Sequence, residues 1–297
     1  MATLSDARRF PGEPGASNVL ALPMGSEDAL RMVGPFAIAG FHTRKGIAAG
    51  ELPVDADVRP HPHIGLAAIT YMVEGHLTHR DSLGHRRELA PGSVGLTIAG
   101  RGIVHSERFE RLRVHGGDHA LFQLLLALPE PVETMEPSFA YVAPDAIPLE
   151  RREGITARFL AHEARGALSL PMPTLLVDLE LARGARFVPP LAEERAVFVT
   201  RGSLRVGDVE AGEGQVVRLD ADDEAIEATS DARALLLGGA RSGRRYLWWN
   251  YLSSSLERIE EAKAAWRSGT LELPIGDTES FTPAPPDDGR PLRTLNG

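Results

Sequence analysis

Glycine and proline recur at short intervals along this chain and limit its secondary structure to short pieces. Between residues 60 and 108, short β-prone runs end at turns such as Glu74-Gly75, Pro91-Gly92 and Ala99–Gly102. The 297 residues include 30 glycines and 22 prolines, which are spread along the chain rather than gathered in a linker. Short strands with a turn about every ten residues are typical of an antiparallel sandwich or barrel.

The expected strands fall into two groups, separated by a proline- and acid-rich stretch over residues 128–155 that we interpret as an inter-domain connection. The strands are expected at Ala67–Val73, His76–Arg80, Arg86–Leu89, Ser93–Ile98, Ile103–Arg108 and Ala120–Leu128, and then at Leu175–Leu181, Ala196–Thr200 and Ala234–Leu237. Residues 71–77 align with residues 198–204, which places Gly75 on Gly202, and Pro91-Gly92 has a counterpart in Ala211-Gly212. This weak similarity indicates duplication of one β-rich unit.

Three segments follow from this organisation. We expect one domain over residues 1–140, a second over residues 150–252, and a C-terminal helix and tail over residues 253–297. Ser254 and Glu257 fit a capping box at the start of the helix. The proline-rich tail beyond Pro283 is expected to be loosely held.

Composition excludes several classes of protein. Lys and Arg number 32 against 41 Asp and Glu, a net charge of −9, whereas a nucleic-acid surface needs clustered Lys and Arg. Cysteine is absent, which excludes disulfides and thiolate zinc sites. Met1–Pro14 has no apolar signal segment, and the longest apolar stretch, Ala120–Leu128, is too short to span a bilayer. We expect a cytoplasmic protein that contacts neither membranes nor nucleic acid directly.

Two histidine motifs carry the chemistry of the first half. His61-Pro62-His63 and His105-Ser106-Glu107 each place two polar side chains at i and i+2, positions that share one face of a β-strand. Two strands facing each other inside a barrel would bring three imidazoles and a carboxylate to one point, a set that suits a divalent transition metal. The alternative is a buried polar network without a metal, which would have to hydrogen-bond all four groups in a small space.

Other histidines of this half, His76, His79 and His85, lie in or beside a turn-rich hairpin. Such residues are more commonly solvated or hydrogen-bonded than bound to a metal. The second half has no equivalent motif, because His61 and His63 align with Val188 and Pro190 at the offset of the repeat. We therefore expect a metal only in the first domain.

At these motifs the chain resembles the pirins, a family of the cupin superfamily. The resemblance rests on His61-Pro62-His63 with Gly65, on residues 70–84, and on Ala99–Glu107. Residues 135–139 and Trp249–Ser255 also look like those of bacterial pirin-like proteins.

The resemblance implies an all-β bicupin, in which two antiparallel β-barrels of jelly-roll type pack together, with a short C-terminal helix. It implies one metal in the N-terminal barrel, held by His61, His63, His105 and Glu107, and a degenerate C-terminal barrel. The family's metal is usually iron, so we expect Fe(II), although Zn, Ni, Cu or Mn can occupy such a site in purified protein. Some pirins are similar in activity to quercetin 2,3-dioxygenases, which open a flavonol ring with O2, and others are described as regulators.

We therefore expect a metal-dependent dioxygenase acting with O2 on a small aromatic substrate of flavonol type, with Glu107 as its catalytic base. The alternative is a non-enzymatic, iron-dependent regulator that acts through a protein partner. Ala67 stands where many bacterial relatives have an acidic residue, so we expect low flavonol turnover. We also expect the Ala67→Glu exchange to leave metal binding intact and to raise turnover, provided that the pocket has room for the added side chain.

Overall fold

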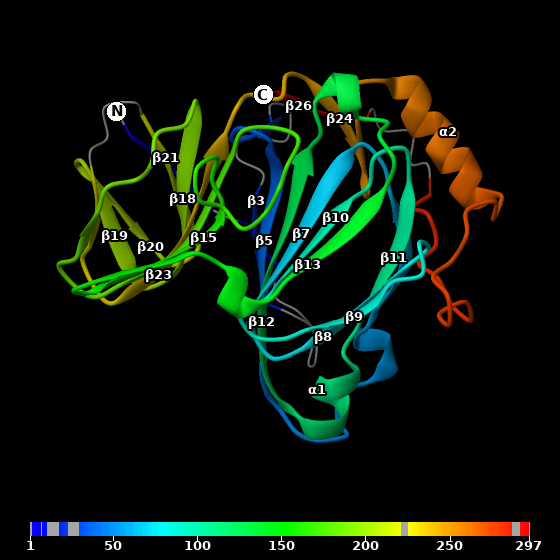
Figure 1. Ribbon diagram of the computed structural model, residues 1–297, viewed down its shortest axis with the longest axis horizontal. Coiled ribbons are helices and arrows are strands. Elements are labelled where there is room, and N and C mark those ends of the chain that lie inside the picture. Colours follow the sequence, from blue (N-terminus) through cyan, green and yellow to red (C-terminus); the bar gives the residue numbers. More distant parts are fainter. Residues whose placement is uncertain are drawn as a thin grey trace.

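The computed structural model describes residues 2–6, 8–10, 18–22, 30–220, 225–286 and 292–296. The segment Met1–Pro14 and the tail beyond Pro283 lie partly outside these residues. Strands dominate the fold (Figure 1), and the α-helices are Glu110–His115 (α1) and Leu256–Arg267 (α2). Short 3-10 helices occur at Val54–Ala56, Glu130–Val132 and Pro144–Ala146. Among the described helices, none has the length and apolar character that a membrane span requires.

Two facing sheets form the N-terminal domain. The larger has seven antiparallel strands in the order β13-β10-β7-β12-β5-β3-β2, and the smaller has the order β6-β11-β8-β9. Their bounds are Arg8–Phe10 (β2), Asn18–Leu22 (β3), Phe36–Ile47 (β5), Val58–His63 (β6), Leu66–Glu74 (β7), Leu77–Asp81 (β8), Arg86–Leu89 (β9), Val94–Ile98 (β10), Ile103–Arg108 (β11), Gly117–Ala127 (β12) and Ser138–Val142 (β13).

The C-terminal domain repeats this arrangement. Its larger sheet has the order β1-β21-β18-β23-β16-β15-β14, and its smaller sheet has the order β17-β22-β19-β20. The bounds are Thr3–Asp6 (β1), Leu149–Arg152 (β14), Ile155–Ala161 (β15), Thr174–Leu181 (β16), Arg186–Phe187 (β17), Glu194–Arg201 (β18), Ser203–Val206 (β19), Val209–Gly212 (β20), Gln215–Leu219 (β21), Ile226–Ala228 (β22) and Ala232–Gly239 (β23).

The expected all-β pair of domains with a short C-terminal helix is confirmed, although the facing sheets are not closed into barrels. The stretch over residues 128–155 is more than a connection, because β13 pairs with β10 in one domain and β14 pairs with β15 in the other. The N-cap of α2 is Ser255, whose side chain accepts a hydrogen bond from Arg258 N, and not Ser254 as expected.

The turns of the repeat correspond closely in the two domains. Gly75 and Gly202 follow β7 and β18, the third strands of the two larger sheets, and both have positive φ, 78° and 72°. Gly92 N donates to Met72 O, and Gly214 N donates to Val199 O in the same way. The counterpart of Pro91-Gly92 is therefore Glu213-Gly214 rather than Ala211-Gly212, which belongs to strand β20 and not to the turn.

The two larger sheets pack against each other and share one apolar core. Ile69, Tyr71 and Phe122 from the N-terminal domain belong to the same buried cluster as Leu176 and Phe198 from the C-terminal domain. At its edge the Tyr71 hydroxyl donates to Asp178 Oδ2 at 2.8 Å. Asp178 also forms ion pairs with Arg158 and Arg233, which offset the cost of burying its carboxylate.

The two ends of the chain cross between the domains. Strand β1 pairs with β21 in the C-terminal sheet. After β23 the chain returns to the N-terminal domain and forms a small sheet, β25-β24-β26-β4, with bounds Tyr251–Ser253 (β25), Arg245–Trp248 (β24), Arg293–Asn296 (β26) and Leu30–Arg31 (β4). The expected loose tail is thus held at β26, where Leu295 is fully buried.

Candidate metal centre

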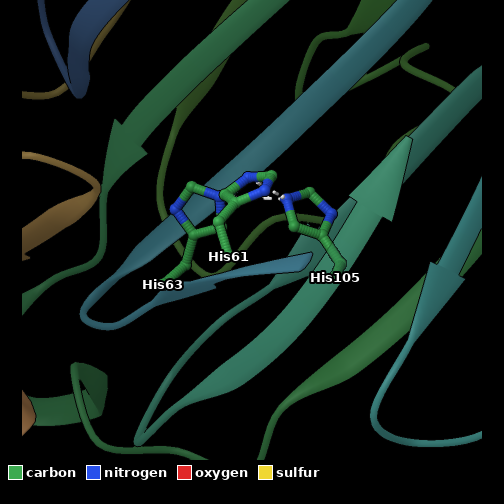
Figure 2. Close-up of side chains that lie close together, drawn as sticks. All are labelled: His61, His63 and His105. Atoms are coloured by element: carbon green, nitrogen blue, oxygen red, sulfur yellow. Dashed lines mark hydrogen bonds between the residues drawn. The ribbon is translucent and has the colours of Figure 1, made fainter. Parts of the chain in front are cut away.

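Three imidazoles meet on the inner face of the smaller N-terminal sheet. His61 on β6 lies directly across from His105 on β11, and His63 pairs with Ile103 two residues along. His105 Nε2 lies 3.0 Å from His61 Nε2 and 2.9 Å from His63 Nε2. Figure 2 shows the three rings turned toward one point. One potential ligand atom from each ring lies within 4.8 Å of the other two, and no other such group of three occurs in the described part of the chain.

The i, i+2 spacing places these side chains on one strand face, as the sequence indicates. The strands themselves are arranged differently from the expectation. β6 and β11 are hydrogen-bonded neighbours in one sheet, and do not face each other across a barrel as the sequence predicted. The three imidazoles therefore converge across one pair of neighbouring strands, and the pairing shifts at a bulge between His105 and Glu107.

Backbone carbonyls fix the outer nitrogens of two rings. His61 Nδ1 lies 2.9 Å from Arg59 O, and His63 Nδ1 lies 3.0 Å from Asn250 O. A carbonyl oxygen can only accept a hydrogen bond, so both Nδ1 atoms carry the proton. In the neutral imidazoles, the lone pairs of His61 Nε2 and His63 Nε2 are therefore free for a metal.

Burial keeps these imidazoles neutral. It lowers the pKa of His61 to about 4 and that of His63 to about 3, and it lowers the pKa of His105 well below its ordinary value. Positive charge on one protonated ring would also repel a proton on the next ring, which lowers the pKa of His63 and His105 further. Because a metal binds only unprotonated imidazole, the site needs no proton release from these rings near neutral pH.

The donor set fits a divalent transition metal. The three Nε2 atoms lie within hydrogen-bond distance, and those of His61 and His63 are both acceptors. His105 Nε2 has at most one hydrogen to donate, so at least one buried acceptor is left without a hydrogen bond. Among the described residues no group hydrogen-bonds His105 Nδ1 either. A cation would use all three lone pairs, and imidazole suits iron, nickel, copper or zinc.

Glu107, the fourth expected ligand, lies beside this group rather than within it. Its Oε1 is 3.9 Å from His105 Nε2, and its side chain is 7% exposed. Burial raises the pKa of Glu107 to about 7, so in the absence of a cation the carboxyl holds a proton through much of the neutral range. Glu107 as a metal ligand remains a prediction.

A fourth histidine lies beside the site on the neighbouring strand. His79 on β8 lies across from Glu107, its Nε2 is 3.0 Å from Asp81 Oδ2, and its ring stacks on Phe139 with centroids 4.0 Å apart. His85 also hydrogen-bonds Asp81. These contacts agree with the hydrogen-bonded interpretation of His79 and His85.

The larger sheet faces the histidines with a polar layer between two apolar ones. Ala68 and Leu125 pack with Ile103 at one end of the interior, while Met72 and Leu121 pack with Leu77 at the other. Between them lie Thr70 and Gln123, joined by a 2.9 Å hydrogen bond from Thr70 Oγ1 to Gln123 Oε1. On the adjacent strand β5 the same layer continues with Gly40, which pairs with Gln123.

This polar layer keeps contact with solvent. Gln123 lies on the inner face of a central strand, and His42 lies one step along the same face of β5, yet both side chains are only half-buried. A side chain on the inner face of the sheet keeps solvent-exposed area only if the interior beside it is open to solvent. Burial and nearby Arg44 lower the pKa of His42 to about 4, so its ring is neutral and can accept a hydrogen bond.

Ala67 does not belong to this interior. It is fully buried in the core between the domains, on the face of β7 that points away from the histidines. A glutamate there would be a buried carboxylate among apolar residues. The expectation that Ala67→Glu raises turnover is therefore replaced by one of destabilisation.

Comparisons with known proteins agree with this geometry. Residues 19–126 match the Pirin family model, and residues 176–272 match the model of the Pirin C-terminal cupin domain. A pirin-like protein of Caulobacter vibrioides is 42% identical over 265 residues, which cover 86% of this chain and 91% of the relative.

This chain belongs to the pirin family.

Solved pirin structures have the same architecture. A quercetin 2,3-dioxygenase from Acinetobacter baumannii matches with a TM-score of 0.82 and 25% identity, over 98% of both chains. A bacterial pirin from Escherichia coli, solved in complex with nickel(II), matches with a TM-score of 0.62 and 20% identity, over 81% of this chain and all of the other. The fold is therefore that of the bicupin pirins.

Two features of the site were missed by the sequence analysis. The acceptor for His63 is a main-chain carbonyl, and backbone atoms leave no residue signature. The polar layer of Gly40, Thr70 and Gln123 comes from three strands without a motif. Thr70 did leave a signal in the sequence. At the offset of the repeat it falls on Val197, so a polar residue stands where the other half has an apolar one.

Proposed function

We propose that this pirin is an iron(II)-dependent dioxygenase that acts with O2 on aromatic substrates of flavonol type. The observation that carries the proposal is the half-open polar layer opposite three converging imidazoles. The structural likeness to a quercetin 2,3-dioxygenase, at 25% identity, supports the choice of substrate class.

In this proposal His61, His63 and His105 hold the metal through Nε2, with Glu107 as a further ligand. When bound, the metal supplies Lewis-acid and redox chemistry for a reaction with O2. The apolar layers around Ala68 and Met72 offer surface for aromatic rings. Thr70 and Gln123 offer hydrogen bonds to ring hydroxyls, which fix the orientation of the substrate.

Glu107 is the proposed base. A flavonol hydroxyl proton would pass to a carboxylate oxygen of Glu107. A base works best when its pKa is near the working pH, and burial raises the pKa of Glu107 to about 7. A bound cation lowers that value, so the carboxylate is a weaker base while it contacts the metal. We expect slow turnover for this reason.

The test is aerobic consumption of quercetin by iron-loaded protein, measured as initial rate per bound iron. The double variant Thr70→Val/Gln123→Leu makes the polar layer apolar. It should keep its iron and raise the KM for quercetin by about 30-fold, since two lost hydrogen bonds of about 1 kcal/mol each amount to about 2 kcal/mol. Thr43→Val is the control. It makes the same Thr-to-Val change on β5, on the face that points away from the polar layer, and should match wild type.

Two results would contradict the proposal in different ways. If fully iron-loaded wild type consumes no flavonol, the dioxygenase assignment is wrong. If wild type is active and the double variant has the same KM, the polar layer does not contact the substrate.

A further inference from the structure

A segment from the far end of the chain completes the metal centre. We call residues 245–255 the C-terminal strap; it comprises β24, the turn Trp249-Asn250, β25 and the N-cap of α2. Leu252 N donates to Ile64 O at 3.2 Å, and Tyr251 forms a parallel bridge with Ile64. These contacts place Asn250 O within 3.0 Å of His63 Nδ1.

The main chain of the site is shaped to receive the strap. Gly65, two residues after His63, has a φ of 68°. A Cβ at Gly65 would overlap the carbonyl oxygen of Leu252 and lie 3.2 Å from Glu133 Oε1. Glycine is thus required here by both the backbone angle and the close approach of the strap.

The turn of the strap holds a strained residue beside the metal ligand. Trp249 has a φ of 52° and is the only non-glycine residue with positive φ in the described ranges. It occupies the first loop position of a two-residue hairpin, where glycine is favoured. A bulky residue persists in this conformation only where surrounding contacts enforce it. Trp248 and Tyr251 both pack on its ring.

Glu133 anchors the strap to the N-terminal domain. Its side chain is 2% exposed and forms an ion pair with Arg258 Nη1 at 2.7 Å. The same carboxylate accepts hydrogen bonds from Ser253 Oγ and from Ser254 N. One buried carboxylate therefore joins the N-terminal domain, β25 and the first turn of α2.

We propose that the C-terminal strap is a working part of the metal centre and that Glu133 is its positioning residue. Glu133 holds β25, β25 sets Asn250 O, and Asn250 O keeps the proton of His63 on Nδ1 so that Nε2 points to the metal. Mutating a group that orients a metal ligand through hydrogen bonds typically weakens metal affinity by about 10- to 100-fold. The inference rests on the proposed metal site and is independent of the substrate.

The first measurement is the Kd for Co(II) and Zn(II), obtained by chelator competition on folded, metal-free protein. Glu133→Ala should weaken binding by about 10- to 100-fold. Glu133→Gln keeps an acceptor oxygen for Ser253 and Ser254 and should recover part of the loss. Glu136→Ala is the matched control, because Glu136 lies three residues away, is exposed and forms an ion pair with Arg101, which lies outside the strap.

The second measurement separates positioning from stability. The ¹⁵N shifts of His63 in metal-free protein report which nitrogen carries the proton. Wild type and Glu136→Ala should show a single Nδ1–H form, whereas Glu133→Ala should show mixed tautomers. Unchanged His63 shifts in Glu133→Ala would overturn the inference, even if its affinity or melting temperature fell.

The remaining outcomes are also decisive. If wild type binds no metal, the proposed metal site fails. If wild type binds metal and Glu133→Ala binds it as tightly as Glu136→Ala, only the strap inference fails. Should Glu133→Ala not fold, Ser253→Ala removes one anchor hydrogen bond while retaining the ion pair, and it must still weaken binding and mix the His63 tautomers.

Discussion

Thr70, Gln123 and Gly40 lie side by side on β7, β12 and β5 of the N-terminal domain. In the C-terminal domain the corresponding neighbours on β18, β23 and β16 are Val197, Leu236 and Val177, which are all fully buried. The C-terminal interior is accordingly one continuous apolar cluster. The N-terminal interior is divided into two clusters, with the polar layer and the histidines between them.

The smaller sheets differ in the same way. β17 and β22 occupy the places of β6 and β11, and they present Phe187, Ile226 and Ala228 to the interior, each at most 5% exposed. The repeat offset points to Val188 and Pro190 as the counterparts of His61 and His63, but β17 ends at Phe187 and Val188 is 71% exposed. The same arrangement of sheets thus supports either a filled core or a half-open site, and the inward-facing residues decide which.

The largest contrast between the domains should be in metal binding. We predict one metal per chain, and His61→Ala or His105→Ala should each weaken binding by more than about 100-fold, since even indirect partners of a ligand cost up to that much. His162→Ala, in the C-terminal domain, should bind like wild type. Elemental analysis and chelator competition on folded protein measure this, and near-full metal content in both variants would show that the assignment is wrong.

The next contrast concerns catalysis. Glu107→Gln on β11 should lower the rate per bound iron by at least about tenfold, because general-base contributions are commonly 10²- to 10⁴-fold. Glu227→Gln on β22, the counterpart strand, should leave the rate unchanged. Rates are normalised to iron measured in the same sample. A wild-type rate per iron in Glu107→Gln would exclude Glu107 as the base.

Acid should act mainly on the N-terminal domain. His119 is fully buried, neither ring nitrogen has a hydrogen-bond partner within the described residues, and burial lowers its pKa to about 3. Below pH 6.5 the unfolded chain binds a proton there that the folded chain does not, so stability falls as pH decreases toward 3. From pH 7 to pH 5 this one group accounts for about 2 kcal/mol.

The variant His119→Leu should therefore lose less stability between pH 7 and pH 5 than wild type. His115→Leu, which changes an exposed histidine of the same domain, is the control. Calorimetric melting of metal-free protein at both pH values gives the comparison. Equal acid sensitivity in His119→Leu and wild type would mean that His119 is protonated in the folded chain.

The smallest contrast exchanges single residues between equivalent places. Val197→Thr puts a hydroxyl into the continuous C-terminal core and should cost about 1–3 kcal/mol. Thr70→Val in the N-terminal domain removes a hydroxyl from a layer that reaches solvent and should change stability by less than about 1 kcal/mol. Melting temperatures of the two variants measure the difference, and equal losses would show that the two interiors are equally dry.

The sequence predicted the part of this contrast that depends on residue type and strand spacing. His61, His63 and His105 were found because i, i+2 pairs share a strand face, and most strands were found because turns interrupt apolar runs. The sequence could not show that β6 and β11 are neighbours, since pairing is a tertiary property. It also could not show the carbonyl of Asn250, or that Ala67 faces the other domain, because a one-residue shift along a strand reverses the face.

The crossing of the chain ends has a consequence for biosynthesis. Translation proceeds at about 5–20 residues per second, so Asn250 is made on the order of ten seconds after His105. During that interval the nascent chain carries all three imidazoles but lacks β24, β25 and β26. Ribosome-bound chains should therefore take up metal weakly, and firm loading should follow release of the finished polypeptide.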